Sequence, residues 1–374
     1  MTSKKGSVCA YLLIAASAVN IYSQAVLKDA FKNHFLVGAA INQAQFLERD
    51  TVGADIVKSQ FNSISPENVL KWGSVHPTDG HFAFDMPDAY VDFGVKNKMF
   101  IIGHTLVWHN QTPKWVFEDG KGNTVTRDVL LRRLHDHIQA VVGRYKGKIS
   151  GWDVVNEALN EDGTMRRSPW YTIIGEDYIA KAFQYAHEAD PAAELYYNDY
   201  SLENEAKRKG AVELIKKLLA QKIPVKAIGL QGHDKLDWPT VQQKEATIKA
   251  FADLGIRVNI TELDIDVLPS VDKYHGADIT VNYKLQEKLN PYRSGLPVSI
   301  QKDLADRYAA LFKVFLKYDF VIGRVTFWCV TDGDSWLNNW PVRGRSNYPL
   351  LFDRQGKQKA AFDAVIKTAL PAGN

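Results

Sequence analysis

Two glutamates at the ends of apolar segments are the residues best placed to do chemistry. Glu157 follows the segment ISGWDVVN, which begins at Ile149, and Glu262 lies near the end of RVNITELD, which begins at Arg257. Two carboxyl groups that face each other can cleave a glycosidic bond, because one protonates the leaving oxygen while the other attacks the anomeric carbon or activates water. Taken singly, each glutamate could instead be a solvated carboxylate or one half of an ion pair.

Polar side chains also end most of the other apolar segments of the chain. They are Glu67, Asn68, Lys71, His104, Trp108, Asn156, Gln231 and His233. Gln231 and His233 are two positions apart, so on one strand both side chains face the same side, where one could hold a nucleophilic carboxylate ionised. The same parity places His104 and Trp108 on one wall. For each histidine the alternative is a buried imidazole bonded to backbone, and for Lys71 it is a solvated cation.

Some histidines have a spacing that resembles metal ligands. His104 and His109 are five positions apart on a predicted strand, so they point to opposite faces, and His135 and His137 diverge on a predicted helix. The sequence contains no HExxH motif. We therefore predict neither a catalytic metal nor another cofactor.

The elements that must position these residues alternate between short apolar strands and amphipathic helices. We predict strands at FLVGAAI from Phe35, FNSISPEN from Phe61, FIIGHTLVW from Phe100, ISGWDVVNEA from Ile149, AELYYNDY from Ala193, AIGLQGH from Ala227, RVNITELD from Arg257 and RVTFWCVT from Arg324. The clearest helical patterns cover residues 127–146, 203–221 and 301–317, and Thr126 can cap the first of them.

Eight strands that alternate with helices require parallel pairing, and eight such units close into a TIM (β/α)8 barrel of the α/β class. The alternative is an open doubly wound sheet, but no GxGxxG or GxxxxGK[ST] motif follows the first strand. Active sites of TIM barrels lie at the carboxyl ends of the strands, which is where the candidate residues stand.

The composition is that of a folded globular protein with a surplus of aromatic side chains. The chain has 374 residues, 45% of them hydrophobic, and a formal net charge of +3 with both signs interspersed. This balance does not indicate nucleic-acid binding. The 9 Trp, 16 Tyr and 17 Phe include several that stand beside polar residues in loops, a combination that suits sugars.

The first 24 residues are typical of a secretory signal peptide. Lys4 and Lys5 precede an apolar run over residues 8–19, and the small residues Ser23 and Ala25 follow. The run is shorter than the roughly 20 residues that a membrane span needs. We therefore expect cleavage near residue 24, one catalytic domain over residues 25–374, a secreted or periplasmic location and no membrane contact after cleavage. Cys329 would then be the single cysteine, which excludes an intramolecular disulfide.

Seven motifs in order resemble glycoside hydrolase family 10, the endo-1,4-β-xylanases, from about Phe35 to the end of the chain. They are ENVLKW at 67–72, GHTLVWH at 103–109, WDVVNEA at 152–158, YYNDY at 196–200, GLQGHD at 229–234, NITELD at 259–264 and TFWCVTDGDSW at 326–336. Any one of these motifs alone would be weak, whereas seven in the family's order are specific.

The resemblance implies a retaining mechanism on xylan and xylo-oligosaccharides, with Glu157 as general acid and then base and Glu262 as nucleophile. It implies further that His233 bonds to Glu262 and that Asn156 binds the 2-hydroxyl of the sugar being cleaved. The other substrate-binding residues implied are Lys71, His104, Trp108 and Gln231 at that sugar, Glu67 and Asn68 at the next sugar on the non-reducing side, Trp328 and Trp336 as walls, and Tyr200 on the leaving-group side.

These roles place opposite demands on the two carboxyl groups. Glu157 must be protonated near neutral pH, which requires apolar or anionic surroundings that raise its pKa. Glu262 must stay charged, which requires hydrogen-bond donors such as His233.

Two departures from the family pattern and three competing functions remain open. Cys329 stands where the family commonly has glycine, and Ser65 where it has a threonine-type residue. Residues 272–300 resemble the family's long loop after the seventh strand.

The same catalytic pair would serve a β-1,4-glucanase or a β-1,3-xylanase. A barrel that binds xylan without cleaving it would need the loss of a carboxylate or of its support, and Glu157, Glu262 and His233 are all present. We expect a monomer.

Overall fold

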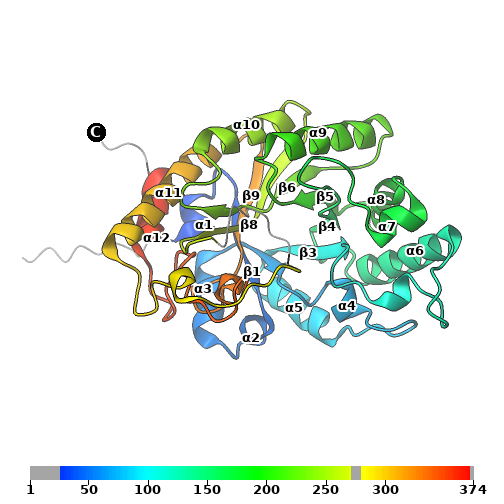
Figure 1. Cartoon of the computed structure of the whole chain (residues 1–374), viewed down its shortest axis with the longest axis horizontal. Coiled ribbons are helices and arrows are strands. Elements are labelled where there is room, and N and C mark those ends of the chain that lie inside the picture. Colours follow the sequence, from blue (N-terminus) through cyan, green and yellow to red (C-terminus); the bar gives the residue numbers. More distant parts are fainter. Residues whose placement is uncertain (1–25, 271–278, 371–374) are drawn as a thin grey trace, which may run out of the picture.

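A computed structural model describes residues 26–270 and 279–370 of the chain. The predicted signal peptide and part of the long loop after the seventh predicted strand lie outside these residues. The described chain forms a central barrel of strands surrounded by helices, as Figure 1 shows. No helix among the described residues combines the length and the apolar character that crossing a membrane requires.

Eight parallel strands form the barrel wall. Their hydrogen-bonded order is β6-β5-β4-β3-β2-β1-β9-β8, and β6 pairs with β8 to close the barrel. The strands are β1 (Leu36–Ile41), β2 (Ser63–Pro66), β3 (Phe100–Val107), β4 (Gly151–Asn156), β5 (Glu194–Asp199), β6 (Ala227–Leu230), β8 (Arg257–Asp266) and β9 (Ile322–Phe327). The predicted TIM barrel is confirmed.

Two predicted strands extend three or four residues beyond the carboxyl ends of the observed ones. We predicted one strand over residues 227–233, but β6 ends at Leu230 and a separate strand, β7 (His233–Lys235), pairs with the second half of β8. The break includes Gly232, whose φ of +79° is a conformation that glycine adopts without steric cost. The strand predicted from Arg324 begins at Ile322 and ends at Phe327, so Trp328 already belongs to the loop above the barrel.

Helices cover the outside of the barrel, including the three helices predicted from sequence periodicity. The helices are α1 (Leu27–Ala30), α2 (Gln43–Phe46), α3 (Thr51–Gln60), α4 (Trp72–Val75), α5 (Asp85–Lys96), α6 (Arg127–Arg144), α7 (Pro169–Ile174), α8 (Tyr178–Ala189), α9 (Glu205–Ala220), α10 (Val241–Ala252), α11 (Val298–Lys317) and α12 (Ala360–Ala369). Short 3-10 turns occur at Lys114–Val116, Glu287–Leu289 and Trp336–Asn338. Thr126 caps α6 by accepting a hydrogen bond from the Val129 amide.

The barrel interior supports the floor of the site above it. A side chain at Gly103 would lie 2.1 Å from the indole of Trp152, so only glycine fits that position of β3. Above it, the Nδ1 atom of buried His104 is 2.9 Å from an oxygen of Asp153, whose other oxygen lies 3.7 Å from the Arg324 guanidinium. His104 is thereby held by charged groups of the core.

A pair of buried histidines packs behind α4, the helix that follows Lys71. The rings of Trp72 and His137 stack at 3.6 Å, and the Nδ1 atoms of His137 and His76 are 3.2 Å apart. Burial lowers the pKa of His76 to about 4 and holds the pKa of His137 well below its ordinary value. Both imidazoles are therefore neutral in the folded protein at neutral pH.

This pair predicts a loss of stability in mild acid. An unfolded histidine takes up a proton near pH 6.5, whereas folded His76 does so near pH 4. The contribution of neutral His76 to the free energy of unfolding is therefore complete above pH 6.5 and is lost as the pH falls toward 4. We expect the drop in unfolding free energy between pH 7 and pH 4.5 to be smaller by about 2 kcal/mol in His76→Phe than in the parent chain. Urea denaturation at the two pH values measures this difference.

The matched control is His135→Gln, because His135 lies on α6 as His137 does but is only half-buried. It should keep the pH dependence of the parent chain. An unchanged pH dependence in His76→Phe would contradict the assignment.

Candidate active site

All the predicted site residues except Tyr200 line one pocket at the carboxyl ends of the strands. The pocket has a volume of about 180 Å³. Its lining comprises Glu67, Asn68, Lys71, His104, Trp108, Gln111, Asn156, Glu157, Gln231, His233, Glu262, Ile279, Trp328 and Trp336. The barrel therefore brings together residues that are up to 269 positions apart, from Glu67 to Trp336.

Glu157 owes its orientation to an unusual backbone conformation just past the end of β4. Its φ is +58°, in the left-handed region, which costs a residue with a side chain about 1–2 kcal/mol. Two bonds hold the conformation: the Glu157 amide donates to the Asn198 carbonyl at 2.9 Å, and the Ala158 amide donates to the Tyr197 hydroxyl at 3.1 Å. The turn keeps the carboxyl group in the pocket rather than continuing the strand.

A chain of side-chain amides connects the two carboxyl groups. Gln231 Nε2 lies 3.0 Å from Glu157 Oε1 and 3.2 Å from Asn156 Oδ1. Asn198 Nδ2 lies 2.9 Å from the same Asn156 oxygen and 2.7 Å from Glu262 Oε1. Both glutamates are thus fixed by donors that are themselves fixed, and a displacement of one amide would disturb both carboxyl groups.

The surroundings shift the pKa values of the two carboxyl groups in opposite directions. Burial raises the pKa of Glu157 to about 7, and the nearby charges of Asp199 and Glu262 add to this effect. Burial would also raise the pKa of Glu262, but hydrogen bonding to His233 and the positive charge of His104 and His233 outweigh burial, so that its pKa lies below the ordinary value. Near neutral pH the pocket therefore holds one carboxyl group that can give a proton and one that is charged.

His233 stands between two carboxylates and links the pocket to its aromatic wall. Its Nε2 atom is 3.2 Å from Glu262 Oε2 and its Nδ1 atom is 3.0 Å from Asp264 Oδ1. Burial would lower the pKa of His233, but the charge of Asp264 and the hydrogen bonds raise it to about 10. Trp336 Nε1 donates to the other Asp264 oxygen at 2.7 Å. His233 is consequently a cation held against Glu262.

The remaining wall of the pocket combines Lys71 with indole rings. The Lys71 ammonium lies 5.1 Å from the Trp108 ring centre and 5.9 Å from that of Trp328, and it donates to Asn68 Oδ1 at 3.1 Å. Burial lowers the pKa of Lys71 and raises the pKa of Glu67 to about 7. Apolar ring faces beside fixed hydrogen-bonding groups suit a sugar.

The chain matches the model of glycosyl hydrolase family 10 over residues 26–368. It belongs to glycosyl hydrolase family 10. It is 45% identical over 359 residues to endo-1,4-beta-xylanase A of Xylanibacter ruminicola, an alignment that covers 96% of this chain and 97% of that protein. It is 43% identical to a beta-1,4-xylanase of Dictyoglomus thermophilum, over 91% of this chain and 90% of that one.

Solved structures agree with the family assignment. A GH10 endoxylanase retrieved from a sugarcane soil metagenome has a TM-score of 0.89 and 45% identity to this chain, and the match covers 91% of this chain and 99% of that one. The resemblance inferred from the seven motifs is confirmed.

Tyr200 is the one predicted substrate-binding residue of this family 10 chain that does not line the pocket. It is 4% exposed, and its hydroxyl accepts a hydrogen bond from Arg166 at 3.1 Å. The ammonium of buried Lys207 lies 3.4 Å from the centre of its ring. Contact between Tyr200 and the leaving group stays a prediction.

Two residues to which the sequence analysis assigned no role belong to the hydrogen-bonding chain. Asn198 donates to Glu262 from the end of β5, and Asp264 orients His233. Both carry the signal that indicated the other residues, a polar side chain near the carboxyl end of a strand. Ile279, which also lines the pocket, comes from the long loop and has no such signal.

The described residues contain no group of three or more His, Cys, Asp or Glu side chains arranged to hold a metal ion. Cys329 is a free, buried thiol beside Trp328. Its φ of +82° is a conformation that glycine adopts most readily, so the cysteine occupies a position whose backbone favours glycine.

The hydrogen bond from Trp108 to Glu157 predicts a shift in the pH profile. Trp108 Nε1 donates to Glu157 Oε2 at 2.8 Å, which favours the charged carboxylate and lowers the pKa of Glu157. Trp108→Phe removes this donor, so we expect the alkaline limb of kcat/KM, set by a Glu157 pKa of about 7 in the parent chain, to move to higher pH.

The pH profiles of parent and variant on one oligosaccharide measure the shift, whatever the loss of absolute activity. Trp115→Phe is the control, because its Nε1 atom bonds to the Pro77 carbonyl outside the pocket. A limb that stayed in place or moved to lower pH would refute the assignment of Glu157 as the acid.

Proposed function

We propose that this family 10 chain is a retaining endo-1,4-β-xylanase in which Glu157 is the general acid and base and Glu262 the nucleophile. The observation that carries the proposal is the pair of buried carboxyl groups in one pocket, one with a raised pKa and the other with a lowered pKa. Two carboxyl groups with opposite protonation states are what retaining glycoside cleavage requires, and family 10 enzymes are retaining.

In the first half-reaction Glu157 gives its proton to the glycosidic oxygen while Glu262 attacks the anomeric carbon. The bond between that carbon and the oxygen breaks, the leaving sugar departs with the proton, and the remaining sugar is esterified to Glu262. His233 and Asn198, which each bond to one Glu262 oxygen, hold the nucleophile in place as it approaches the sugar.

In the second half-reaction Glu157 acts as a base. Glu157 has already given its proton to the leaving sugar, and esterification removes the negative charge of Glu262, which had raised the pKa of Glu157, so Glu157 remains a carboxylate. This carboxylate takes a proton from water, which attacks the anomeric carbon and releases the sugar with its original configuration.

Two observations support xylan as the substrate: the names of the relatives and the indole rings that line the pocket. The two relatives above are named as xylanases. Xylose lacks the exocyclic hydroxymethyl group of glucose, and Trp328 and Trp336 both line the small catalytic pocket, where such a group would need extra room. This argument favours xylan over β-1,4-glucan as the substrate.

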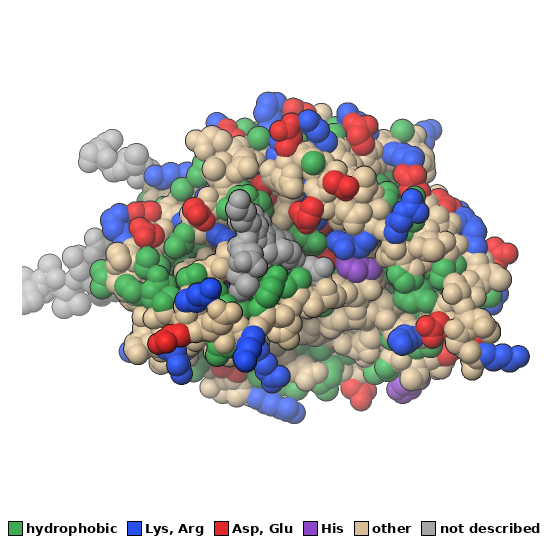
Figure 2. Space-filling view, viewed as in Figure 1, with side chains coloured by type: hydrophobic (Ala, Val, Ile, Leu, Met, Phe, Trp, Pro, Cys, Tyr) green, Lys and Arg blue, Asp and Glu red, His purple; other side chains and the backbone are tan. Residues whose placement is uncertain are grey.

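We propose further that the protein acts outside the cytoplasm as a monomer, on xylan and xylo-oligosaccharides and not on nucleic acid. Residues 1–24 support export, because they have the charge and hydropathy pattern of a signal peptide. On the face drawn in Figure 2, lysines and arginines are interspersed with aspartates and glutamates, which is not the continuous basic surface that nucleic acid requires. Amino-terminal sequencing of protein recovered from the periplasm and medium tests the export, and light scattering tests the monomer.

Proton NMR of the first products tests substrate and mechanism together. Soluble xylan and cello-oligosaccharides are digested in parallel, and the anomeric signals are recorded before mutarotation. Initial β-anomer from xylan alone supports the proposal. Initial α-anomer would contradict the role of Glu262 as nucleophile, and cleavage of the glucan alone would keep the mechanism and change the substrate.

Substitution of each catalytic glutamate should give a different pattern. Glu262→Ala should abolish turnover of every substrate. Glu157→Ala should lose about 10²–10⁴-fold on xylan, but should still form the glycosyl intermediate from aryl xylosides whose leaving group needs no proton. Azide should then restore turnover of these xylosides by replacing the water that Glu157 activates.

Steady-state and burst kinetics with and without azide distinguish the two variants. Glu176→Ala, which removes an exposed carboxylate on the outside of the barrel, should behave as the parent chain. If Glu157→Ala were equally inactive on activated and natural substrates, the assignment of the acid would be wrong.

A further inference from the structure

Arg166 donates to three successive carbonyl groups, of which the first belongs to Glu157. Its backbone amide donates to the Ala158 carbonyl at 2.7 Å, and its Nε atom donates to the Glu157 carbonyl at 3.1 Å. Its Nη2 atom donates to the Leu159 carbonyl at 3.2 Å and to the Tyr200 hydroxyl at 3.1 Å. The backbone from Glu157 to Leu159 is therefore attached to one residue.

This attachment acts on the strained turn that directs the Glu157 carboxyl group into the pocket. The φ of +58° costs about 1–2 kcal/mol, so the turn persists only where surrounding bonds hold it. Asn198 and Tyr197 accept from the N–H groups of the turn, whereas Arg166 donates to its C=O groups. Without the Arg166 guanidinium the turn would be held from one side only.

The loop after β4 fixes Arg166 in turn. Leu159 and Met165 form an antiparallel bridge, so the loop folds back and places Arg166 opposite Ala158. The Ser168 amide donates to the Arg166 carbonyl at 2.8 Å, and Ser168 caps the start of α7. Because its own backbone is held in this way, Arg166 can resist a displacement of Glu157.

The guanidinium of Arg166 is half-buried and stays charged beside the acid. Burial would lower the pKa of Arg166, but its interactions with Tyr200 and with the charges of Glu157 and Asp199 outweigh burial and raise it. A guanidinium is a planar fork of donors, whereas an ammonium is a compact point charge. The bonds to the Glu157 carbonyl, the Leu159 carbonyl and the Tyr200 hydroxyl use this fork, so lysine could not replace them.

We propose that Arg166 is a positioning residue that fixes the direction in which Glu157 delivers its proton, and that the Tyr200 hydroxyl holds Arg166 in that role. The inference rests on the proposed xylanase function and deepens it. Among the described residues Arg166 is absent from the lining of the catalytic pocket, so it acts through Glu157. A misdirected acid slows the steps that need its proton, because the acid must be within hydrogen-bond reach of the leaving oxygen.

Two substrates that differ only in their leaving group test this role in the full chain. Phenyl β-xylobioside releases a basic phenolate that needs a proton from the acid, whereas dinitrophenyl β-xylobioside releases an anion that does not. The measured quantity is the kcat/KM on the phenyl substrate divided by that on the dinitrophenyl substrate, which we call the leaving-group ratio. A general defect of the fold lowers both kcat/KM values and leaves this ratio unchanged.

Substitution of Arg166 should lower the leaving-group ratio. Arg166→Met removes the guanidinium, and we expect a loss of about 10–10²-fold, the effect of misplacing a catalytic group without removing it. Arg166→Lys keeps the charge but not the fork, so it should also lower the ratio. Arg167→Met is the matched control and should keep the parent ratio, because Arg167 is exposed and its guanidinium lies 5.9 Å from the ring centre of Tyr171.

Tyr200→Phe tests the second half of the proposal, and it decides the matter if the Arg166 variants fail to fold. It keeps the ring and removes the acceptor for Arg166, so the ratio should fall by about two- to ten-fold, the value of one hydrogen bond. The double variant Arg166→Met/Tyr200→Phe should lose no more than Arg166→Met, because both changes break the same bond. Additive losses would overturn the link between the two residues.

The outcomes separate this role from the proposed function. An unchanged ratio in Arg166→Met, or a parent ratio in Arg166→Lys, overturns the positioning role if Glu157→Ala loses the ratio as expected. An unchanged ratio in Glu157→Ala would instead overturn the assignment of the acid, and the role of Arg166 with it. Inactivity of the parent chain on both xylobiosides would overturn the xylanase proposal itself.

Discussion

Two carboxyl groups that share one buried pocket must remain in opposite protonation states, and most of the polar structure at the barrel mouth serves that condition. Burial by itself raises the pKa of both, so burial cannot distinguish them. The distinction comes from the partners. Glu262 receives a histidine cation and an amide donor, whereas Glu157 has Asp199 among its charged neighbours. The asymmetry is therefore one of surrounding charge rather than of depth.

The barrel holds the two glutamates through the same two amide residues, Asn198 and Gln231, which use both backbone and side chain. The Glu157 amide bonds to the Asn198 carbonyl, and the Glu262 amide bonds to the Gln231 carbonyl at 2.7 Å. Asn198 and Gln231 then use their side chains to hold the opposite glutamates, Glu262 and Glu157. Each amide residue thus joins one glutamate through its backbone to the other through its side chain. Closure of the barrel between β6 and β8 is what makes this crossed arrangement possible.

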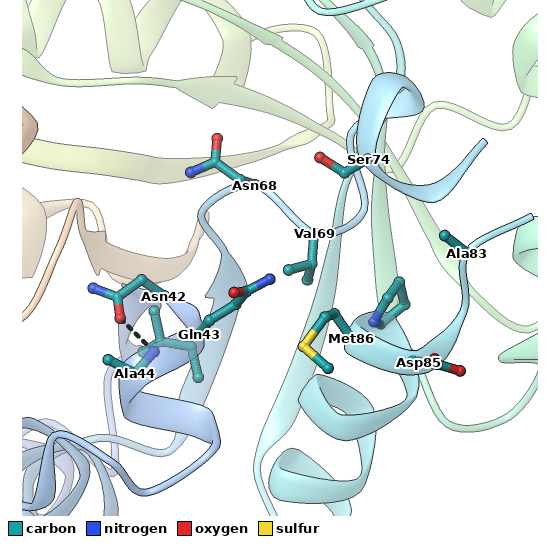
Figure 3. Close-up of a pocket in the computed structure, with 11 residues that line it drawn as sticks. Asn42, Gln43, Ala44, Asn68, Val69, Ser74, Ala83, Asp85 and Met86 are labelled. Atoms are coloured by element: carbon teal, nitrogen blue, oxygen red, sulfur yellow. Dashed lines mark hydrogen bonds between the residues drawn. The ribbon is translucent and has the colours of Figure 1, made fainter. Parts of the chain in front are cut away.

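The sequence was sufficient for the parts of the structure that obey local rules. Apolar runs predicted the strands, 3.6-residue periodicity predicted α6, α9 and α11, and polar residues at strand ends predicted most of the pocket. The break at Gly232 was missed because a glycine within an apolar run does not reveal whether the pairing continues. A cavity beside Asn68 (Figure 3) was missed because it forms between the start of α2, the loop after β2 and the start of α5, whose approach depends on packing and not on any pattern within one of them.

The site also contains backbone conformations that local preference would not choose. Glu157 and Cys329 both have positive φ, at +58° and +82°, and neither is glycine. At Glu157 the conformation has a clear reason, because it turns the carboxyl group away from the path of β4 and two hydrogen bonds hold it there. At Cys329 the thiol has a hydrogen bond with the backbone of Trp336, and the residue is 1% exposed and packs in the main core beside Trp328. Burial of the thiol offsets part of the backbone cost that glycine would avoid. The wall of the pocket at Trp328 is therefore anchored by a packed side chain, where glycine would provide only a compatible turn.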